Sequence, residues 1–214
     1  MKSHQSHNDM SLRHRLMLEN YEAAMEKMPQ DHRSVVWERA SYGEFSELIG
    51  QEALWENFRS NPISSGMGGP YFWDDEYLNS IRSIWESPEF HKRVEDSFNN
   101  LCSLCGQDFV VNLVEPEVGR PASCNVQGRK IAYLPDLTQI YNVYSLKPYI
   151  DAITTRKKPV VMAEIGGGYG GLANKLCKAF PDARYILFDL PEGAAIQYYY
   201  LSSFYEKDDF FSLQ

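Results

Sequence analysis

The sequence is poor in the features that mark membrane, secreted and nucleic-acid-binding proteins. It contains no run of 18 apolar residues, so no segment is suited to spanning a membrane. The start, MKSHQSHNDMSLRHRLMLENY, lacks the apolar core of a signal peptide, and we therefore expect a cytoplasmic protein. Acidic residues outnumber basic ones by 29 to 21, and the resulting net charge of −8 argues against a nucleic-acid partner.

Cysteine is scarce as well. The C-x-x-C pair of Cys102 and Cys105 would need two further ligands to hold zinc, and only Cys124 offers a third. The pair also falls on an apolar stripe with helical spacing. We therefore expect buried thiols and no metal site, with metal binding or redox chemistry as the alternative.

What the chain does contain is enough apolar material for a folded core. Hydrophobic residues make up 43% of it and aromatic residues 14%, which excludes a disordered composition. We expect an α/β fold in two parts. Residues 1–155 form a mostly helical region with a short β element, and residues 156–214 begin a Rossmann-like domain.

The apolar spacing of the first part predicts its elements. Residues 1–8 are expected to be loose, and helices are predicted over residues 11–28, 45–54, 75–85, 87–106 and 136–153, the last with a kink or restart at Pro148. Asp136 is expected to cap that helix. Residues 110–114 are predicted to form a strand, and residues 124–126 and 130–134 a hairpin around Gln127-Gly128. The glycine- and proline-rich residues 61–73 read as a connecting loop, or alternatively as the wall of a pocket.

The second part opens with an unusual concentration of glycine. Residues 160–165 are apolar except for Glu164, which predicts a central parallel strand buried on both faces. Glycine fills five of the next six positions, 166–171, and an amphipathic helix follows. A second apolar run, residues 185–188, ends at Asp189. This order of strand, glycine turn, helix and strand is a βαβ unit.

The glycines have physical roles in such a unit. The chain must turn sharply from strand to helix, which requires positive φ, and its backbone must approach a ligand without a Cβ in the way. The free N–H groups of the helix start then point toward that ligand. Asp189, at the carboxyl end of the next strand, could accept hydrogen bonds from the two hydroxyls of a ribose.

The glycine spacing leaves the ligand open. Gly166, Gly168 and Gly171 fit the dinucleotide pattern G-x-G-x-x-G, whereas Gly166, Gly168 and Gly170 fit G-x-G-x-G equally well. Glu164 separates the two interpretations, because a carboxylate beside the loop would repel a pyrophosphate. It would instead attract the sulfonium and ammonium groups of S-adenosylmethionine.

These motifs resemble a known family. The stretch AEIGGGYGGLA (163–173) is similar to the first motif of class I S-adenosylmethionine-dependent methyltransferases, and YILFDLPE (185–192) to the segment that follows it. Together with AAIQYYYL (194–201), RSNPISSGMGGP (59–70) and IYNVYSLKPYI (140–150), they resemble the sugar O-methyltransferase family. The resemblance implies S-adenosyl-L-methionine as cofactor and transfer of its methyl group to a hydroxyl of a small molecule, sugar or glycan.

The resemblance also implies roles for individual residues. The glycines would surround the methionine part of the cofactor, Glu164 would orient the loop and the cation, Asp189 would bind the ribose, and Leu190 would lie near the adenine. The implied cofactor-binding residues are Glu164, Gly166, Gly167, Gly168, Gly170, Asp189 and Leu190. No catalytic residue is assigned, because all five histidines lie far upstream and are expected to be ordinary surface or core residues.

The sequence departs from the family in length. A complete domain of this class has a seven-stranded sheet, whereas this chain contains only its first βαβ unit. We therefore expect an incomplete domain with an open apolar strand edge, weak cofactor binding and no turnover in isolation. Another chain, such as a second copy of this one, or the helices of the first part could cover that edge. The alternatives are a fragment of an NAD(P)-linked oxidoreductase and a non-catalytic interaction protein.

Overall fold

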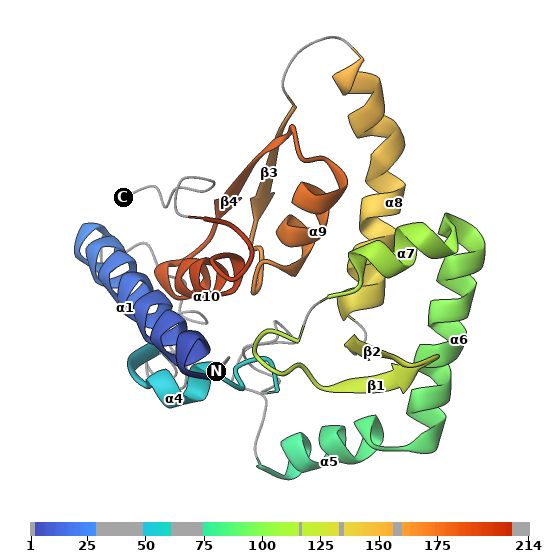
Figure 1. Ribbon diagram of the computed structural model, residues 1–214, viewed down its shortest axis with the longest axis horizontal. Helices are drawn as coiled ribbons and strands as arrows, with labels where there is room; N and C mark the ends of the chain where they lie inside the picture. Colours follow the sequence, from blue (N-terminus) through green and yellow to red (C-terminus); the bar gives the residue numbers. More distant parts are fainter. Residues whose placement is uncertain are drawn as a thin grey trace.

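The computed structural model describes residues 3–28, 49–60, 75–115, 117–132, 135–155 and 160–206, and Figure 1 shows their arrangement. Predictions for residues 61–73 and for the start of the predicted helix 45–54 fall outside these ranges. Helices and strands both occur, which confirms the predicted α/β class. In chain order the elements are α1 (Ser3–Lys27), α4 (Glu52–Trp55), α5 (Asp75–Trp85), α6 (Pro88–Cys105), α7 (Gln107–Leu113), β1 (Ser123–Val126), β2 (Arg129–Ala132), α8 (Pro135–Thr154), β3 (Val161–Ile165), α9 (Gly171–Ala179), β4 (Arg184–Phe188) and α10 (Pro191–Leu201).

Two predicted elements of the helical region are confirmed together with their end signals. Helix α6 begins after Ser87, whose hydroxyl accepts a hydrogen bond from the Phe90 N–H at 3.2 Å, and it ends at Gly106 with φ of 90°. Strands β1 and β2 form the predicted antiparallel hairpin around Gln127 and Gly128, both of which have positive φ. Local sequence signals were sufficient for both elements.

The predicted strand at residues 110–114 is wrong, because this stretch lies in helix α7 and the turn that follows it. Val110 and Leu113 are both buried there, three residues apart, which is the spacing of a helix face. Gly106 lets the chain change direction between α6 and α7, and the apolar stripe then continues on the second helix. The β-branched valines suggested a strand, but packing against the core determines the outcome.

Two other helix predictions differ from the structure. Helix α1 begins at Ser3, so the start of the chain that was expected to be loose is helical from that residue. Helix α4 ends at Trp55, within one residue of the predicted end at 54. Helix α8 continues through Pro148 to Thr154 rather than restarting there. None of the described helices is both long enough and apolar enough to cross a lipid bilayer.

The glycine-rich part folds as predicted. Strand β3 pairs in parallel with β4, with Val161 opposite Arg184 and Ile165 opposite Phe188, and α9 connects the two strands. The loop after β3 and the end of β4 therefore lie at the same edge of the sheet. Figure 1 shows α9 beside the strands, and α10 following β4 toward α1.

One face of this sheet is open within the described residues. Val161, Ala163 and Ile165 are exposed and alternate with the partly buried Met162 and Glu164. The exposed fraction reaches 89% at Ile165. The expectation that β3 is buried on both faces is therefore wrong for the described part of the chain, where only the face carrying Met162 and Glu164 is partly covered and Met162 packs against the core that includes Leu176 of α9.

Two apolar cores hold the molecule together. One core contains side chains from the helices α5, α6, α7, α8 and α9 and from the β1–β2 hairpin. Phe98, Val110 and Ile140 are almost fully buried in it. The other joins α1, the α4 segment and α10, where the ring of Trp55 lies 4.4 Å from that of Tyr199. Tyr169, from the glycine loop, belongs to this second core.

Candidate functional site

The glycine loop has the backbone geometry that the sequence predicted. Gly166, Gly168 and Gly170 have φ of 74°, 56° and 96°, values that only glycine adopts readily. Gly170 precedes the first turn of α9, and the helix begins at Gly171, the last residue of the glycine stretch. The positive φ values confirm the sharp turn between strand and helix.

The surroundings of each glycine separate ligand-facing positions from structural ones. A Cβ placed on Gly166 or Gly168 would meet no atom within 4 Å, so the backbone is accessible at these two positions. A Cβ on Gly167 would lie 2.6 Å from Leu187 Cδ2, and one on Gly171 would lie 2.4 Å from the Tyr169 hydroxyl. Gly167 and Gly171 therefore serve internal packing. The pattern G-x-G-x-x-G arises here partly from a glycine that faces the protein interior.

Glu164 lies on the covered face of β3, where its carboxylate accepts a hydrogen bond from the Tyr185 hydroxyl at 2.8 Å. Burial raises the pKa of Glu164 above its ordinary value, and the nearby Asp189 carboxylate raises it further against the effect of that hydrogen bond. Ionisation of Glu164 is therefore less favourable than it would be in water. A cation near the loop would favour it.

Asp189 follows β4, and its carboxylate is held by backbone and side-chain donors. Its Oδ1 accepts from the Leu190 N–H at 2.8 Å, and its Oδ2 accepts from the Gln197 side chain at 2.6 Å. A Cβ on Gly193 would lie 2.5 Å from the carboxyl carbon, so this group lies against the first turn of α10. Burial of the carboxylate raises the pKa of Asp189, partly offset by these hydrogen bonds.

The structure thus brings the predicted residues to one edge of the sheet. Glu164 and Asp189 flank a loop whose Gly166 and Gly168 present accessible backbone, and Leu190 lies at the start of α10, beside Asp189. Within the described residues no lysine or arginine pairs with either carboxylate. Such a site suits a ligand that is cationic and carries hydroxyl groups.

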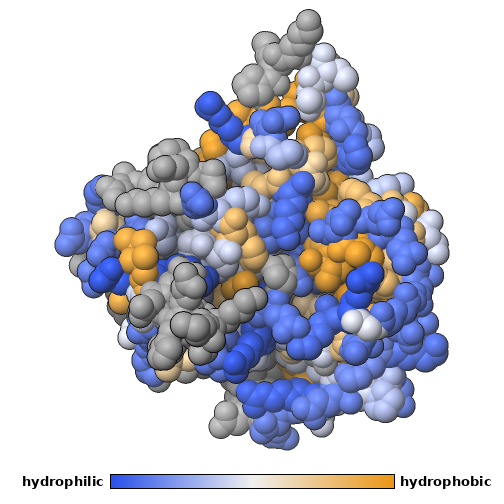
Figure 2. Space-filling model, in the orientation of Figure 1, coloured by the Kyte–Doolittle hydropathy of each residue, from blue (hydrophilic) through white to orange (hydrophobic). Residues whose placement is uncertain are grey.

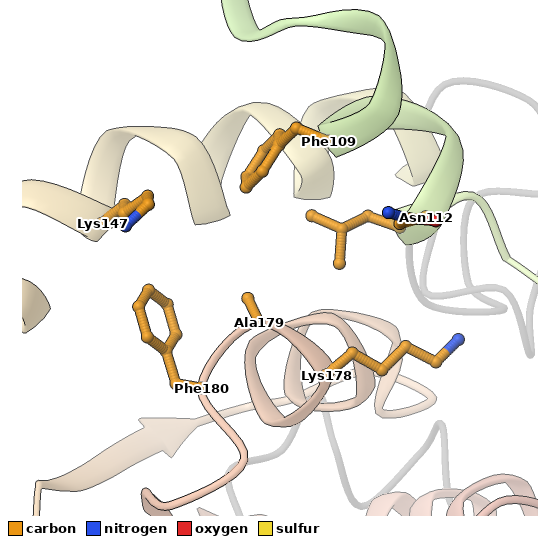
Figure 3. A pocket seen from close by; sticks show the side chains of 7 residues that line it. Phe109, Asn112, Lys147, Lys178, Ala179 and Phe180 are labelled. Carbon is orange, nitrogen blue, oxygen red and sulfur yellow. The ribbon is translucent and has the colours of Figure 1, made fainter.

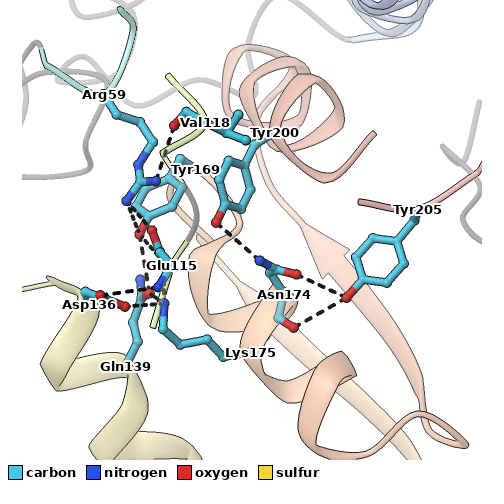
Figure 4. Close-up of polar contacts among 10 residues, drawn as sticks. All are labelled: Arg59, Glu115, Val118, Asp136, Gln139, Tyr169, Asn174, Lys175, Tyr200 and Tyr205. Carbon is cyan, nitrogen blue, oxygen red and sulfur yellow. Dashed lines mark hydrogen bonds and ion pairs between the residues drawn. The ribbon is translucent and has the colours of Figure 1, made fainter. Parts of the chain in front are cut away.

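A second polar cluster lies behind the loop and was not predicted. Figure 4 shows Lys175 of α9 pointing toward Glu115 and Asp136, with Arg59 on the other side of Glu115. The Lys175 ammonium forms an ion pair with Glu115 and lies 2.9 Å from Asp136 Oδ1, and Arg59 forms an ion pair with Glu115. Both partners of each Lys175 pair are fully buried. We refer to Arg59, Glu115, Asp136 and Lys175 as the buried charge cluster.

Tyr169 connects the glycine loop to this cluster. Its hydroxyl donates to Glu115 at 2.6 Å, and its ring lies 4.4 Å from the Arg59 guanidinium carbon. Burial raises the pKa of Tyr169 well above its usual range, and the Glu115 charge adds to that effect. The conformation of the loop therefore depends on residues from the helical region.

The two acids of the cluster differ in their electrostatics. Burial works against ionisation of Glu115, but the attraction of Lys175 and Arg59 outweighs it and lowers its pKa. At Asp136 burial dominates, and the pKa is raised despite the Lys175 charge. Asp136 was expected to cap α8 through its side chain. It instead accepts the Glu115 N–H at 3.4 Å and contacts Lys175.

Sequence reasoning missed this cluster for a physical reason. Its members come from four segments far apart in the chain, and no local pattern links them. The one available signal was Lys175, a charge between the apolar Leu172 and Leu176 on the buried side of α9. Gln197 was also missed, because a glutamine within the aromatic stretch of α10 carries no distinctive spacing.

Other features of the described residues point to no separate chemistry. Cys102 and Cys105 are free and partly buried, and burial raises the pKa of both thiols. No group of histidine, cysteine and acidic side chains within the described ranges is arranged to hold a metal. A shallow cavity of about 320 Å³ lies between α7, α8 and α9, lined by Phe109, Lys147 and Phe180 among others (Figure 3). Apolar surface surrounds this region in Figure 2.

The fold and site together define a βαβ unit with a glycine loop and an acid at the end of its second strand, the arrangement of nucleoside-binding domains. Residues 148–211 match the family model of the O-methyltransferase domain. No curated protein and no solved structure matches the chain. The match covers the βαβ unit and α10, and it supports methyl transfer to a hydroxyl as the activity of this class.

Proposed function

We propose that this chain binds S-adenosyl-L-methionine at the glycine loop and serves methyl transfer to a hydroxyl of a small molecule, with a sugar or glycan as the acceptor. The observation that carries the proposal is the pair Glu164 and Asp189. Both carboxylates have raised pKa values and flank accessible loop backbone, and no cationic side chain of the described residues pairs with them.

The two carboxylates of the site fit S-adenosyl-L-methionine better than they fit a dinucleotide. A pyrophosphate near Glu164 would add negative charge to a site whose two acids already have raised pKa values. A sulfonium or ammonium group would compensate the same charge. Asp189 keeps acceptor capacity for a ribose hydroxyl, because a carboxylate offers about four lone-pair positions and three hydrogen bonds occupy its oxygens, from the N–H groups of Leu190 and Gly167 and from Gln197.

Each residue then has a distinct task. Gly166 and Gly168 allow close approach of the backbone, Glu164 compensates the positive charge, and Asp189 orients the ribose. When bound, the cofactor supplies an electrophilic methyl group on a positively charged sulfur. The described residues contribute mainly orientation, which accounts for a large part of the rate in such transfers.

The acceptor class rests on the upstream resemblance. The stretches at 59–70 and 140–150 are similar to sugar O-methyltransferases, and the O-methyltransferase match begins at residue 148. Because no turnover is expected from this chain in isolation, a panel of sugars and glycans is screened for binding by saturation-transfer NMR in the presence of S-adenosyl-L-methionine. Binding of a sugar is the expected result, and binding of none of them would contradict this part.

A pair of glycine substitutions tests the ligand site itself. Gly168 and Gly128 both have positive φ, and an added Cβ would meet open space at either position, so valine at either causes similar backbone strain. Only Gly168→Val would also block the ligand. We expect isothermal titration calorimetry to show lost cofactor binding in Gly168→Val and retained binding in Gly128→Val. Equal affinities in both variants, or binding of NADH in place of S-adenosyl-L-methionine by the unaltered chain, would contradict the proposal.

A further inference from the structure

Gln197 occupies an unusual position relative to the candidate site. It lies in α10, is 3% exposed, and directs its side-chain amide back toward the loop edge of the sheet. Its Nε2 is 2.6 Å from Asp189 Oδ2 and 3.1 Å from the Gly168 carbonyl oxygen. One buried nitrogen therefore contacts both the acid after β4 and the loop after β3.

The chemistry of the amide matches these two acceptors. A primary amide nitrogen carries two hydrogens, and here one is directed to a carboxylate and the other to a backbone carbonyl. A carboxylate at position 197 would offer no donor and would face two acceptors, the Asp189 carboxylate and the Gly168 carbonyl oxygen. A Cβ on Gly167 would lie 3.1 Å from the same nitrogen, so the absence of a side chain at Gly167 leaves room for Gln197. We refer to the two hydrogen bonds from Gln197 to Asp189 and to the Gly168 carbonyl as the bridge.

The bridge has two consequences for Asp189. The hydrogen bond from Gln197 favours the ionised carboxylate, as do those from the N–H groups of Leu190 and Gly167, against burial and the charge of Glu192. It also fixes which oxygen faces α10, and therefore which lone pairs remain available at the loop. The second hydrogen bond fixes the carbonyl of Gly168, which lies at one of the two accessible backbone positions.

We propose that Gln197 is a positioning residue that holds Asp189 and the Gly168 peptide at a fixed separation, so that the acid and the loop bind one nucleoside ligand together. This inference rests on the proposed function for the identity of the ligand. Gln197 itself does not contact the reacting atoms.

The test compares Gln197→Met and Gln197→Glu with Gln127→Met. Gln127 is exposed in the β1–β2 turn and donates its own amide to Asn99 Oδ1 at 2.9 Å, so its replacement also removes an amide hydrogen bond but far from the loop. We expect affinity for S-adenosyl-L-methionine to fall about tenfold in Gln197→Met and further in Gln197→Glu, since a hydrogen bond to a charged group is lost in each. Gln127→Met should bind like the unaltered chain.

A second measurement separates positioning from general destabilisation and does not need the cofactor. The carboxyl ¹³C signal of Asp189 should titrate at higher pH in Gln197→Met than in the unaltered chain, and amide exchange at Tyr169, whose N–H shares a peptide unit with the Gly168 carbonyl, should become faster. Unchanged titration and exchange in that variant would overturn the inference, even if cofactor affinity fell. A titration shift in a chain that binds no S-adenosyl-L-methionine would instead refute the proposed function and leave the positioning role standing.

The unaltered protein offers a check if Gln197→Met does not fold. The side-chain amide protons of Gln197 should exchange slowly and should shift as Asp189 titrates, because they donate to it. Fast exchange, or signals that do not respond to that titration, would overturn the inference.

Discussion

Replacing Lys175 with methionine tests the role of the buried charge cluster most directly. The cluster is balanced, with Arg59 and Lys175 opposite Glu115 and Asp136, so Lys175→Met leaves it with an excess negative charge. Glu115 keeps Arg59 and the Tyr169 hydroxyl as partners. Asp136 keeps only the Glu115 N–H at 3.4 Å among the contacts described above.

The magnitude follows from the complete burial of the Lys175 pairs. Removing one partner of a buried ion pair costs about 3–5 kcal/mol, because the other charge stays uncompensated in a medium of low dielectric constant. For a chain of this length about 1 kcal/mol corresponds to roughly 2–4 °C, so we expect the melting temperature to fall by about 6–20 °C. Methionine conserves the volume of the lysine stem, so loss of packing contributes little.

Thermal and urea denaturation followed by circular dichroism measure this effect. The matched control is Lys178→Met on the same helix, where the lysine is exposed and forms no ion pair within the described residues. Asp136→Asn combined with Lys175→Met should cost less than the sum of the two single changes, since the uncompensated charge is then absent. If Lys175→Met and Lys178→Met melt at the same temperature, the electrostatic reasoning is refuted.

Two further predictions concern the loop. The pKa values of Glu164 and Asp189 are raised, and a cationic cofactor prefers their ionised forms. Affinity for S-adenosyl-L-methionine should therefore fall as the pH drops through these pKa values and should level off above them. Calorimetry at several pH values checks this, and an affinity that does not change with pH would contradict it. Gly171→Ala should destabilise the protein by about 1–3 kcal/mol in thermal denaturation despite the higher helix propensity of alanine, because its Cβ would lie 2.4 Å from the Tyr169 hydroxyl. Gly50→Ala, where the Cβ meets nothing within 4 Å, is the control and should be neutral or stabilising.

The elements that the sequence predicted well are those whose signals are local. The βαβ unit was predicted because an apolar run, a glycine turn and a helical stripe follow one another directly. The α6 helix carries its own cap at Ser87 and its own end at Gly106. The hairpin follows from Gln127-Gly128 between two short apolar runs.

The misassignments share a different cause. Residues 110–114 are rich in β-branched side chains, yet contact with α6 and α9 selects a helix there. The alternation of exposed and buried residues along β3 could not be read from VVMAEI, because an apolar residue is compatible with either environment. Which face of a sheet is covered depends on segments elsewhere in the chain.

In the candidate site, too, the sequence predicted what depends on local order and missed what depends on contacts between separate elements. Glu164, Asp189 and the glycines stand in a recognisable local order, whereas the partners that hold them come from elsewhere. Tyr185 reaches Glu164 across the sheet, and Gln197 reaches Asp189 from the second turn of α10. Neither contact follows from spacing alone, because each depends on how two elements are placed side by side.

The buried charge cluster also links the two predicted parts of the chain, residues 1–155 and 156–214, in a way that dissection would reveal. Residues 1–155 contribute Arg59, Glu115 and Asp136, which sum to one negative charge, and residues 156–214 contribute the single positive charge of Lys175. Separated polypeptides with these boundaries would each carry an uncompensated ion at the surface where they had met. Mixing them should therefore restore a joint fold, with an association that neither polypeptide shows toward itself.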